Sequence, residues 1–163
     1  MLIKLKNKDQ LIVDDFIFKC AIGKAHFSSK KKEGDKTTPR GLFTLGKIYY
    51  RADRVKKPLS KIESRIITKK MGWCDDPTST AYNKEIKLPS ESSHEKIYKR
   101  GSSYNYFIVI NYNIKKITPY KGSAIFLHLT KNYKPTAGCI VVSEKDFLII
   151  LKLINKKTLI KIS

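Results

Sequence analysis

Cys139 and His128 are the two residues whose side-chain types and spacing suit covalent catalysis. Cys139 precedes a short apolar segment, residues 140–142, and His128 lies 11 positions upstream at the end of another. A free thiol has a pKa near ~8.5, so it needs a base or a positive neighbour before it acts as a nucleophile. The alternative is that Cys139 is a small buried hydrophobic residue and that a carbonyl satisfies His128.

The residues just before Cys139 are small and suit an oxyanion site. Gly138 frees the backbone, so that N–H groups near the thiol can point at a developing oxyanion, and Thr136 can orient the loop through its hydroxyl. Two adjacent strands joined by residues 129–138 would bring His128 beside the sulfur. A cysteine and a histidine at moderate spacing also occur without any catalytic role, so the residues alone leave both interpretations open.

The chain has three cysteines, an odd number that leaves at least one free thiol. It has no CxxC motif and no Cys/His pair with the spacing of a structural zinc site, so we predict neither a metal site nor a cofactor. We assign Cys20, Cys74 and His26 to structure. Cys20 alternates with Phe16 and Phe18, which suits a strand position that faces the core.

Length and composition indicate one folded domain, residues 1–163, with 41% hydrophobic residues. The formal net charge of +20 fits either a polyanionic partner, such as nucleic acid or an anionic membrane, or a solvated lysine-rich surface. No stretch approaches the ~18–20 apolar residues of a membrane span. The first residues have no signal-peptide pattern, so we expect a cytoplasmic protein or a mature or trimmed form.

The elements that must position these residues are mostly strands. Apolar and polar residues alternate near the N-terminus, and β-branched and aromatic residues dominate four later segments. We predict short strands within residues 2–25 and further strands over residues 42–51, 104–113, 122–129 and 158–163. Residues 104–113 form a continuous apolar run, which is typical of a central strand.

Two helices are predicted. Ser143 and Asp146 resemble a capping box before an apolar helical face that contains Phe147 and Leu151. A short helix is expected near residues 92–99, where serines precede an acidic residue in the first turn. The predicted fold is therefore mostly β (α+β), with one main helix after Cys139.

Several motifs together resemble the YkuD-like L,D-transpeptidase family. "GSAIFLH" followed by "PTAGCIVVS" resembles the catalytic segment of that family, and "GDKTTPRGLFTLG" is similar to its Thr-Pro-x-Gly loop. "MGWCDDP…AYN", "SSHE" and "YNYFIVINYN" resemble the subgroup whose cysteine motif reads Thr-Ala-Gly-Cys. The resemblance covers nearly the whole chain and implies a β-sandwich-like fold.

The resemblance also implies roles for individual residues. Cys139 would be the nucleophile and His128 the base, with Gly138, Thr136 and Ala137 in the loop around the oxyanion site. The family's commoner motif has a second histidine where this chain has Ala137, and a longer gap after the first histidine. That departure removes a polar group from beside the nucleophile and bears on acceptor binding and thiol activation.

The implied activity is an L,D-transpeptidase acting on peptidoglycan stem peptides through a thioester, with a role in cell-wall biogenesis and cell shape. The rival reaction on the same fold is hydrolysis, by an L,D-carboxypeptidase or an amidase. The rival from another class is a basic nucleic-acid-binding β-domain, which needs aromatic and basic residues interleaved on one sheet face. Peptidoglycan as the partner implies the cell envelope or periplasm.

Other residues match positions characteristic of the subgroup and have two interpretations. They either form a wall of the cleft that holds a zwitterionic stem peptide, or they are local architecture in which Asp and Asn side chains hold turns. The candidates are Trp73, Asp75, Tyr82, Asn83 and His94. Arg40 can pair with a substrate carboxylate, although a solvated loop arginine is the simpler interpretation.

Overall fold

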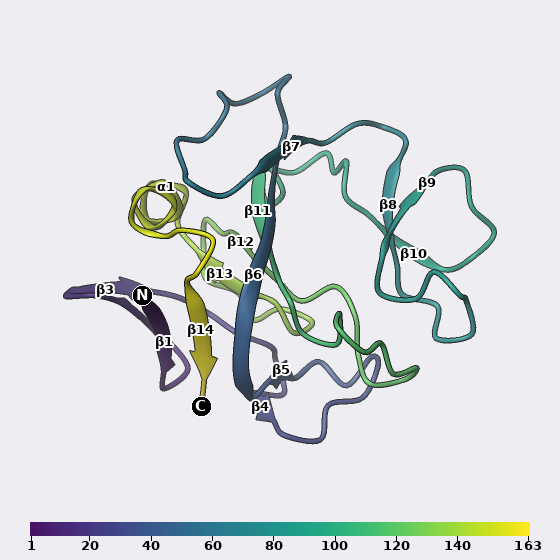
Figure 1. Cartoon of the computed structure of the whole chain (residues 1–163), viewed down its shortest axis with the longest axis horizontal. Helices are drawn as coiled ribbons and strands as arrows, with labels where there is room; N and C mark the ends of the chain where they lie inside the picture. Colours follow the sequence, from purple (N-terminus) through teal and green to yellow (C-terminus); the bar gives the residue numbers. More distant parts are fainter.

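The structure is a computed structural model that describes residues 1–163, and it is mostly β (Figure 1). Its strands are β1 (Leu2–Lys6), β2 (Gln10–Val13), β3 (Phe16–Lys19), β4 (Phe27–Ser28), β5 (Thr38–Pro39), β6 (Gly41–Tyr50), β7 (Ser64–Ile66), β8 (Met71–Cys74), β9 (Glu85–Lys87), β10 (His94–Lys96), β11 (Tyr106–Ile110), β12 (Phe126–Leu129), β13 (Ile140–Val142) and β14 (Leu159–Ile162). One helix, α1 (Glu144–Leu153), follows β13. The strands predicted from the sequence are confirmed in kind and in place.

Most strands belong to one nine-stranded sheet in the order β13-β12-β11-β6-β14-β1-β2-β3, with β7 beside β6. The ten-residue strand β6 joins the two halves, because it pairs with β11 along one edge and with β14 along the other. Just after β3, Ala21 exchanges two backbone hydrogen bonds with Val141 of β13, at 3.0 and 2.9 Å. The two ends of the sheet are thereby tied together around a shared core.

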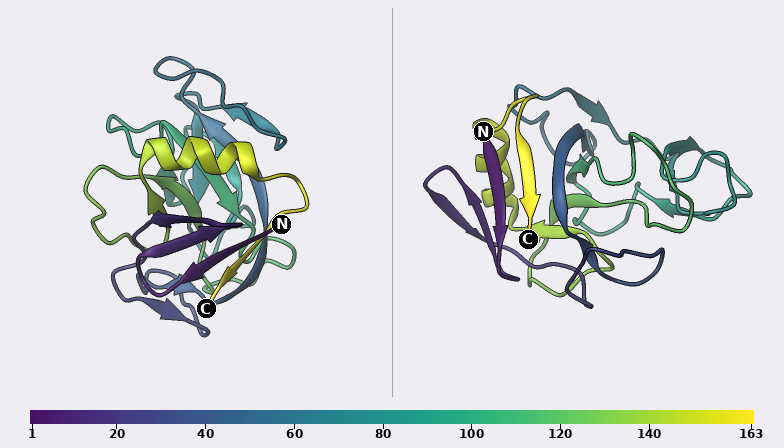
Figure 2. Two further views of the ribbon diagram at one scale, coloured as in Figure 1. Left: turned by 90° about the vertical axis from the view of Figure 1, so that its left-hand side faces the viewer. Right: turned by 60° about the horizontal axis from the view of Figure 1, so that its bottom comes forward.

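The main core lies between the two halves of this sheet and under α1, and it contains 24 buried side chains (Figure 2). Alternate residues of the N-terminal strands enter it, as the apolar–polar alternation predicts. Phe18 and Cys20 are buried, whereas Phe16 at the start of β3 is 51% exposed. The predicted inward position of Cys20 is therefore confirmed, while the alternation does not extend to Phe16.

A second, aromatic core covers the opposite face of β6, β11 and β12. Tyr49 stacks on Phe107, and Trp73 and Tyr104 meet Phe126 edge-on. Because both faces of the sheet are covered here, all five residues of β11 are buried. This burial explains the continuous apolar run, and it leaves no exposed aromatic face on β11 for stacking nucleic-acid bases.

Helix α1 begins as predicted. Ser143 has an extended backbone, and its hydroxyl accepts a hydrogen bond from the backbone N–H of Asp146 at 3.1 Å, which satisfies one free donor of the first turn. Phe147, Ile150 and Leu151 on one face are buried in the main core. The helix thus closes that core directly after the strand that follows Cys139.

The predicted short helix near residues 92–99 is wrong. His94–Lys96 form strand β10, which pairs with β8 in a separate three-stranded sheet of order β10-β8-β9. Ser93, expected as a helix cap, donates its hydroxyl to Asp75 instead. A single helical turn is marginal by itself, so backbone pairing with β8 decides the conformation here.

No helix of the chain is both long and apolar enough to cross a membrane.

Candidate active site

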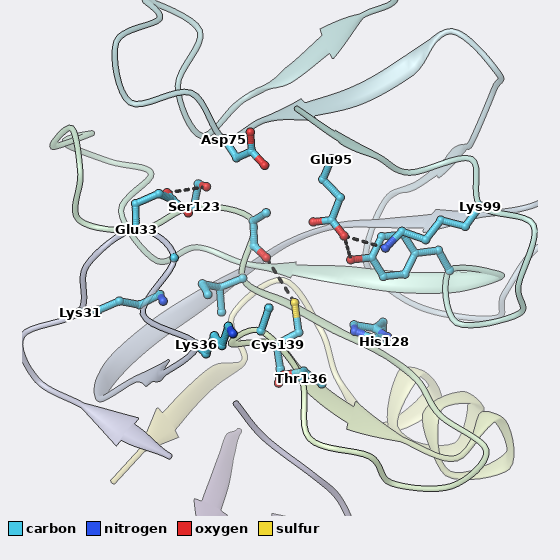
Figure 3. Close-up of a pocket in the computed structure, with 15 residues that line it drawn as sticks. Lys31, Glu33, Lys36, Asp75, Glu95, Lys99, Ser123, His128, Thr136 and Cys139 are labelled. Atoms are coloured by element: carbon cyan, nitrogen blue, oxygen red, sulfur yellow. Dashed lines mark hydrogen bonds and ion pairs between the residues drawn. The ribbon is translucent and has the colours of Figure 1, made fainter. Parts of the chain in front are cut away.

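A cavity of about 420 Å³ opens between the loop that leads to Cys139, the segment before β12, the small sheet and the loop that precedes β5, with Tyr104 also in its wall. Figure 3 shows its side chains, with Cys139 at the centre of the floor. Its lining consists of Lys31, Glu33, Gly34, Lys36, Asp75, Glu95, Lys99, Tyr104, Ser123, Ala124, Ile125, His128, Thr136, Ala137 and Cys139. Four of the five residues predicted around the thiol line this cavity: His128, Thr136, Ala137 and Cys139. The fifth, Gly138, lies between Ala137 and Cys139 in the same loop, so the structure brings all five together.

Parallel pairing places Cys139 and His128 on one face of the sheet. Strands β12 and β13 are adjacent, as predicted, and they run parallel with Leu127 opposite Ile140. Cys139 therefore lies beside Phe126, whose backbone N–H donates to the thiol sulfur at 3.4 Å. His128 is two residues further along β12, and side chains two residues apart share a face. Figure 3 shows the imidazole next to Cys139.

No direct hydrogen bond joins the two side chains in this conformation. The thiol of Cys139 donates to the carbonyl oxygen of Ala124 at 3.3 Å. His128 Nδ1 lies 3.1 Å from the carbonyl oxygen of Leu129. If that nitrogen carries the proton, Nε2 is the unprotonated nitrogen and is available as a base. A rotation of the thiol away from Ala124 is then needed before its proton can pass to the imidazole.

The loop before Cys139 is held by Thr136 and Thr38. The Thr136 hydroxyl donates to the carbonyl oxygen of Cys139 at 2.6 Å and accepts from the backbone N–H of Gly138 at 3.1 Å. The Thr38 hydroxyl donates to the carbonyl oxygen of Gly138 at 2.9 Å. The Gly138 amide is thus occupied, whereas the Cys139 amide donates to no protein atom and is free for a ligand.

Gly138 has a backbone conformation that requires glycine. Its φ is +143°, and a Cβ atom there would lie 2.8 Å from the carbonyl oxygen of Thr37. A side chain would therefore both strain the backbone and collide with the loop that carries Thr38. The glycine before the cysteine lets these two loops touch.

Burial keeps both Cys139 and His128 neutral in the unliganded protein. The two residues are 8% and 9% exposed. Burial raises the pKa of the Cys139 thiol to about 12 and lowers the pKa of His128 to about 4. Burial also raises the pKa of Cys20 to about 12. Ionisation therefore does not distinguish Cys139 from Cys20, and what sets Cys139 apart is its place on the cavity wall.

Tyr104 connects His128 to an ion pair on the far wall. Its ring meets the imidazole edge-on, with centroids 4.9 Å apart, and its hydroxyl donates to Glu95 at 2.6 Å. Lys99 donates to the same oxygen of Glu95 at 2.7 Å and lies over the Tyr104 ring. Burial raises the pKa of Tyr104 well above its usual value, and the negative charge and hydrogen bond of Glu95 add to this effect. Tyr104 consequently remains a donor.

The opposite wall carries both signs of charge. Glu33 accepts hydrogen bonds from the hydroxyls of Tyr82 and Ser123, the second at 2.8 Å. Lys31 forms an ion pair with Asp35 at 2.8 Å. With Asp75 and Lys36 also on the wall, the lining offers partners for both ends of a zwitterion.

Trp73 and Asn83 lie behind the cavity rather than in its lining. Asn83 Oδ1 accepts from the indole N–H of Trp73 and from the backbone N–H of Ala124, each at 3.0 Å. Asn83 Nδ2 donates to the carbonyl oxygens of Tyr112 and Asn113. These residues hold the Ala124 segment, whose carbonyl oxygen receives the Cys139 thiol.

Of the other predicted substrate-binding residues, only Asp75 lines the cavity. Tyr82 is buried behind Glu33, and His94 lines a separate cavity on the other side of β10. Arg40 lies outside the cavity, with its guanidinium over the ring of Phe27. Asp75 therefore belongs to the cavity wall, Tyr82 lies behind that wall, and His94 and Arg40 belong to neither.

Sequence reasoning missed most of the charged and polar residues of the lining: Lys31, Glu33, Lys36, Glu95, Lys99, Tyr104 and Ser123. Lys36, Glu95, Tyr104 and Ser123 lie inside segments that resemble the family, but nothing in those segments singled them out, and Lys31, Glu33 and Lys99 lie outside every such segment. The available signal was position in the sequence, because Lys31, Glu33 and Lys36 lie within seven residues before the Thr-Pro-x-Gly motif and Ser123 lies three residues before β12.

Comparison with known proteins agrees with this geometry. No curated protein and no solved structure gives a significant match to the chain. The family model described as the L,D-transpeptidase catalytic domain, YkuD, matches residues 3–162. The match spans both halves of the large sheet, the small sheet, α1 and the cavity around Cys139. The chain therefore belongs to the YkuD family of L,D-transpeptidase catalytic domains.

Proposed function

We propose that this protein is a cysteine-dependent L,D-transpeptidase that acts on peptidoglycan stem peptides. The observation that carries the proposal is the position of Cys139 in a charged cavity, beside a buried histidine whose Nδ1 faces a carbonyl oxygen. That arrangement supplies a nucleophile, a base and a lining of both charges. The family membership supplies the reaction class.

The first half-reaction forms a thioester. The thiol proton passes from Cys139 to Nε2 of His128 as the sulfur attacks the carbonyl carbon of an L-centre linked to a terminal D-amino acid. The free N–H of Cys139 stabilises the oxyanion that develops. The C–N bond then breaks, and His128 returns the proton to the departing amine.

The second half-reaction resolves the thioester. An acceptor amine attacks the same carbonyl carbon and gives up a proton to His128, the C–S bond breaks, and the sulfur takes the proton back. The products are a new amide bond and the original thiol. With water as the acceptor the same steps give hydrolysis, so the acceptor alone decides between transpeptidase and peptidase.

The neutral resting state fits this scheme. With the pKa of the thiol near 12 and that of His128 near 4, the thiolate–imidazolium pair is unfavourable in the unliganded cavity. Proton transfer must therefore be coupled to attack on bound substrate. A neutral resting thiol also limits side reactions with other electrophiles, because the thiolate is the reactive form.

A role in cell-wall biogenesis and cell shape follows from the substrate, and it implies action at the cell envelope. The decisive test is mass spectrometry of a stem tetrapeptide incubated with the protein and with candidate amines. A product that has lost the terminal residue and gained the amine supports transpeptidation, and loss without gain supports the carboxypeptidase. Cys139→Ala is the matched control, and turnover in that variant would refute the mechanism.

A further inference from the structure

Lys31 is a buried lysine on the cavity wall that the catalytic scheme leaves unused. Its side chain is 4% exposed, which is exceptional for a lysine. Burying an ammonium group is costly unless hydrogen bonds and charges compensate it. A lysine held in this position beside a candidate nucleophile therefore calls for a function.

Two glycines make room for the Lys31 side chain. A Cβ atom on Gly122 would lie 2.7 Å from Lys31 Cε, and one on Gly138 would lie 3.6 Å from Lys31 Nζ. Both glycines have positive φ, +103° and +143°. The lysine stem thus lies along one glycine and brings its ammonium group to the other, directly before Cys139.

The ammonium group retains unused donors. Lys31 Nζ makes one hydrogen bond, to Asp35 Oδ1 at 2.8 Å, although an ammonium has three N–H donors. Asp35 is already engaged, because it also accepts from the backbone N–H groups of Lys32 and Thr37 and from the Thr37 hydroxyl. Burial opposes the ionisation of Asp35, but these hydrogen bonds outweigh it and lower its pKa to about 2. Asp35 therefore holds the loop of residues 32–37 in place through these hydrogen bonds, and the remaining donors of Lys31 are free to bind a second anion.

We propose that Lys31 binds the terminal carboxylate of the amino acid that the reaction releases. The inference rests on the proposed function, in which the leaving group is a terminal amino acid. Its carboxylate carbon is roughly 4 Å from the scissile carbon, because only the amide nitrogen and one Cα lie between them. A carboxylate this close to the scissile carbon must bind next to Cys139, and the buried ammonium of Lys31 lies beside Gly138, the residue before Cys139.

The other two lysines of the cavity fit this role less well. Lys36 is exposed, so solvent screens its charge and its side chain is mobile. Lys99 shares Glu95 with Tyr104 and lies over the Tyr104 ring on the opposite side of Cys139 from Lys31 (Figure 3). Lys31 alone combines burial, a packed stem and free donors.

The test compares two stem tetrapeptides, one with a free terminal carboxylate and one with a terminal carboxamide. Lys31→Met removes the ammonium and keeps the apolar stem. We expect kcat/KM for the carboxylate substrate to fall about 10- to 100-fold, the usual effect of losing a charged hydrogen bond, while the carboxamide substrate is unaffected. Lys32→Met is the matched control, since Lys32 is exposed on the same loop and lies outside the lining. Lys31→Gln gives a second neutral variant if Lys31→Met does not fold.

Equal losses for the two substrates would show that Lys31 is only structural and would overturn the inference. The inference would also be overturned if Lys36→Met or Lys99→Met, and not Lys31→Met, selectively lowered kcat/KM for the carboxylate substrate. A second measurement needs no turnover: the ratio of iodoacetate to iodoacetamide labelling at Cys139, which should fall roughly 3- to 10-fold in the Lys31 variants. An unchanged ratio also counts against Lys31. If wild-type protein turns over neither peptide, the proposed function fails, and the labelling ratio still tests Lys31 separately.

Discussion

Asn83 Oδ1 accepts the backbone N–H of Ala124 at 3.0 Å, and the carbonyl oxygen of the same Ala124 accepts the thiol of Cys139 at 3.3 Å. The Asn83 side chain, which lies outside the cavity, thus fixes the residue whose carbonyl oxygen accepts the Cys139 thiol. Asn83 also receives the indole N–H of Trp73. The hydrogen bonds that Asn83 makes behind the cavity therefore help to fix the position of the Cys139 thiol.

Asn83→Ala should lower both stability and activity. It leaves the buried Trp73 donor and the partly buried Ala124 donor without a partner, so we expect the free energy of unfolding to fall by about 2–4 kcal/mol, as measured in urea. Asn132→Ala, in an exposed loop, should change it by less than about 0.5 kcal/mol. A similar small effect at Asn83 would show that the Ala124 segment holds its position without this side chain.

Carbapenem labelling should give one adduct per chain, on the peptide that contains Cys139. Cys20 and Cys74 are 2% and 0% exposed and lie in the two sheets or at their edges, away from the cavity, so they should stay unlabelled in the native protein. Peptide mapping after brief exposure measures this, and Cys139→Ala should abolish the adduct. Preferential labelling of Cys74 would contradict both the site and the mechanism.

His128→Gln should slow acylation of Cys139 by about 10²–10⁴-fold, because glutamine keeps polar bulk but cannot take the thiol proton. Acylation rates measured against pH for both proteins test the role of the imidazole. Coinciding profiles would leave His128 with a structural role only.

Acid should destabilise the protein partly through His128. Its pKa of about 4 in the folded state lies below the ordinary value of 6.5, so the unfolded chain binds the extra proton first as pH falls. The free energy of unfolding should therefore drop between about pH 6.5 and pH 4, by up to about 3 kcal/mol. Urea unfolding at several pH values should show a shallower drop in His128→Gln. Equal slopes would mean that other groups account for the acid sensitivity.

Gly138→Ala should lower stability by about 2–4 kcal/mol, since it combines backbone strain with a collision at Thr37. Substitutions at two other glycines separate the effect of backbone strain from the effect of the collision. Gly34 has φ of +74° with open space around it, so Gly34→Ala should show the strain alone. Gly101 has neither constraint, and Gly101→Ala should be neutral. Thermal unfolding of the three variants should rank them in that order, and a neutral Gly138→Ala would contradict the proposed packing of the loop.

The sequence by itself determined the parts that depend on local pattern. Alternating and continuous apolar runs located the main strands of the large sheet, and Ser143 marked the start of α1, because side-chain periodicity and capping act over a few residues. The Thr-Ala-Gly-Cys segment and His128 identified the candidate nucleophile and base. Where the local signal was weak, at residues 92–99, the prediction of a helix was wrong, because pairing with a distant strand decided the conformation.

Only the tertiary structure decided what surrounds Cys139. Lys31, Glu95 and Tyr104 are far from Cys139 in the sequence. The packing of the large sheet and the small three-stranded sheet brings all of them to one cavity. Their burial then sets the charge state of the site, since desolvation depends on how the whole chain packs and not on the neighbouring residues. The same packing decided between the two interpretations of Trp73 and Asn83, which lie behind the cavity and support Ala124.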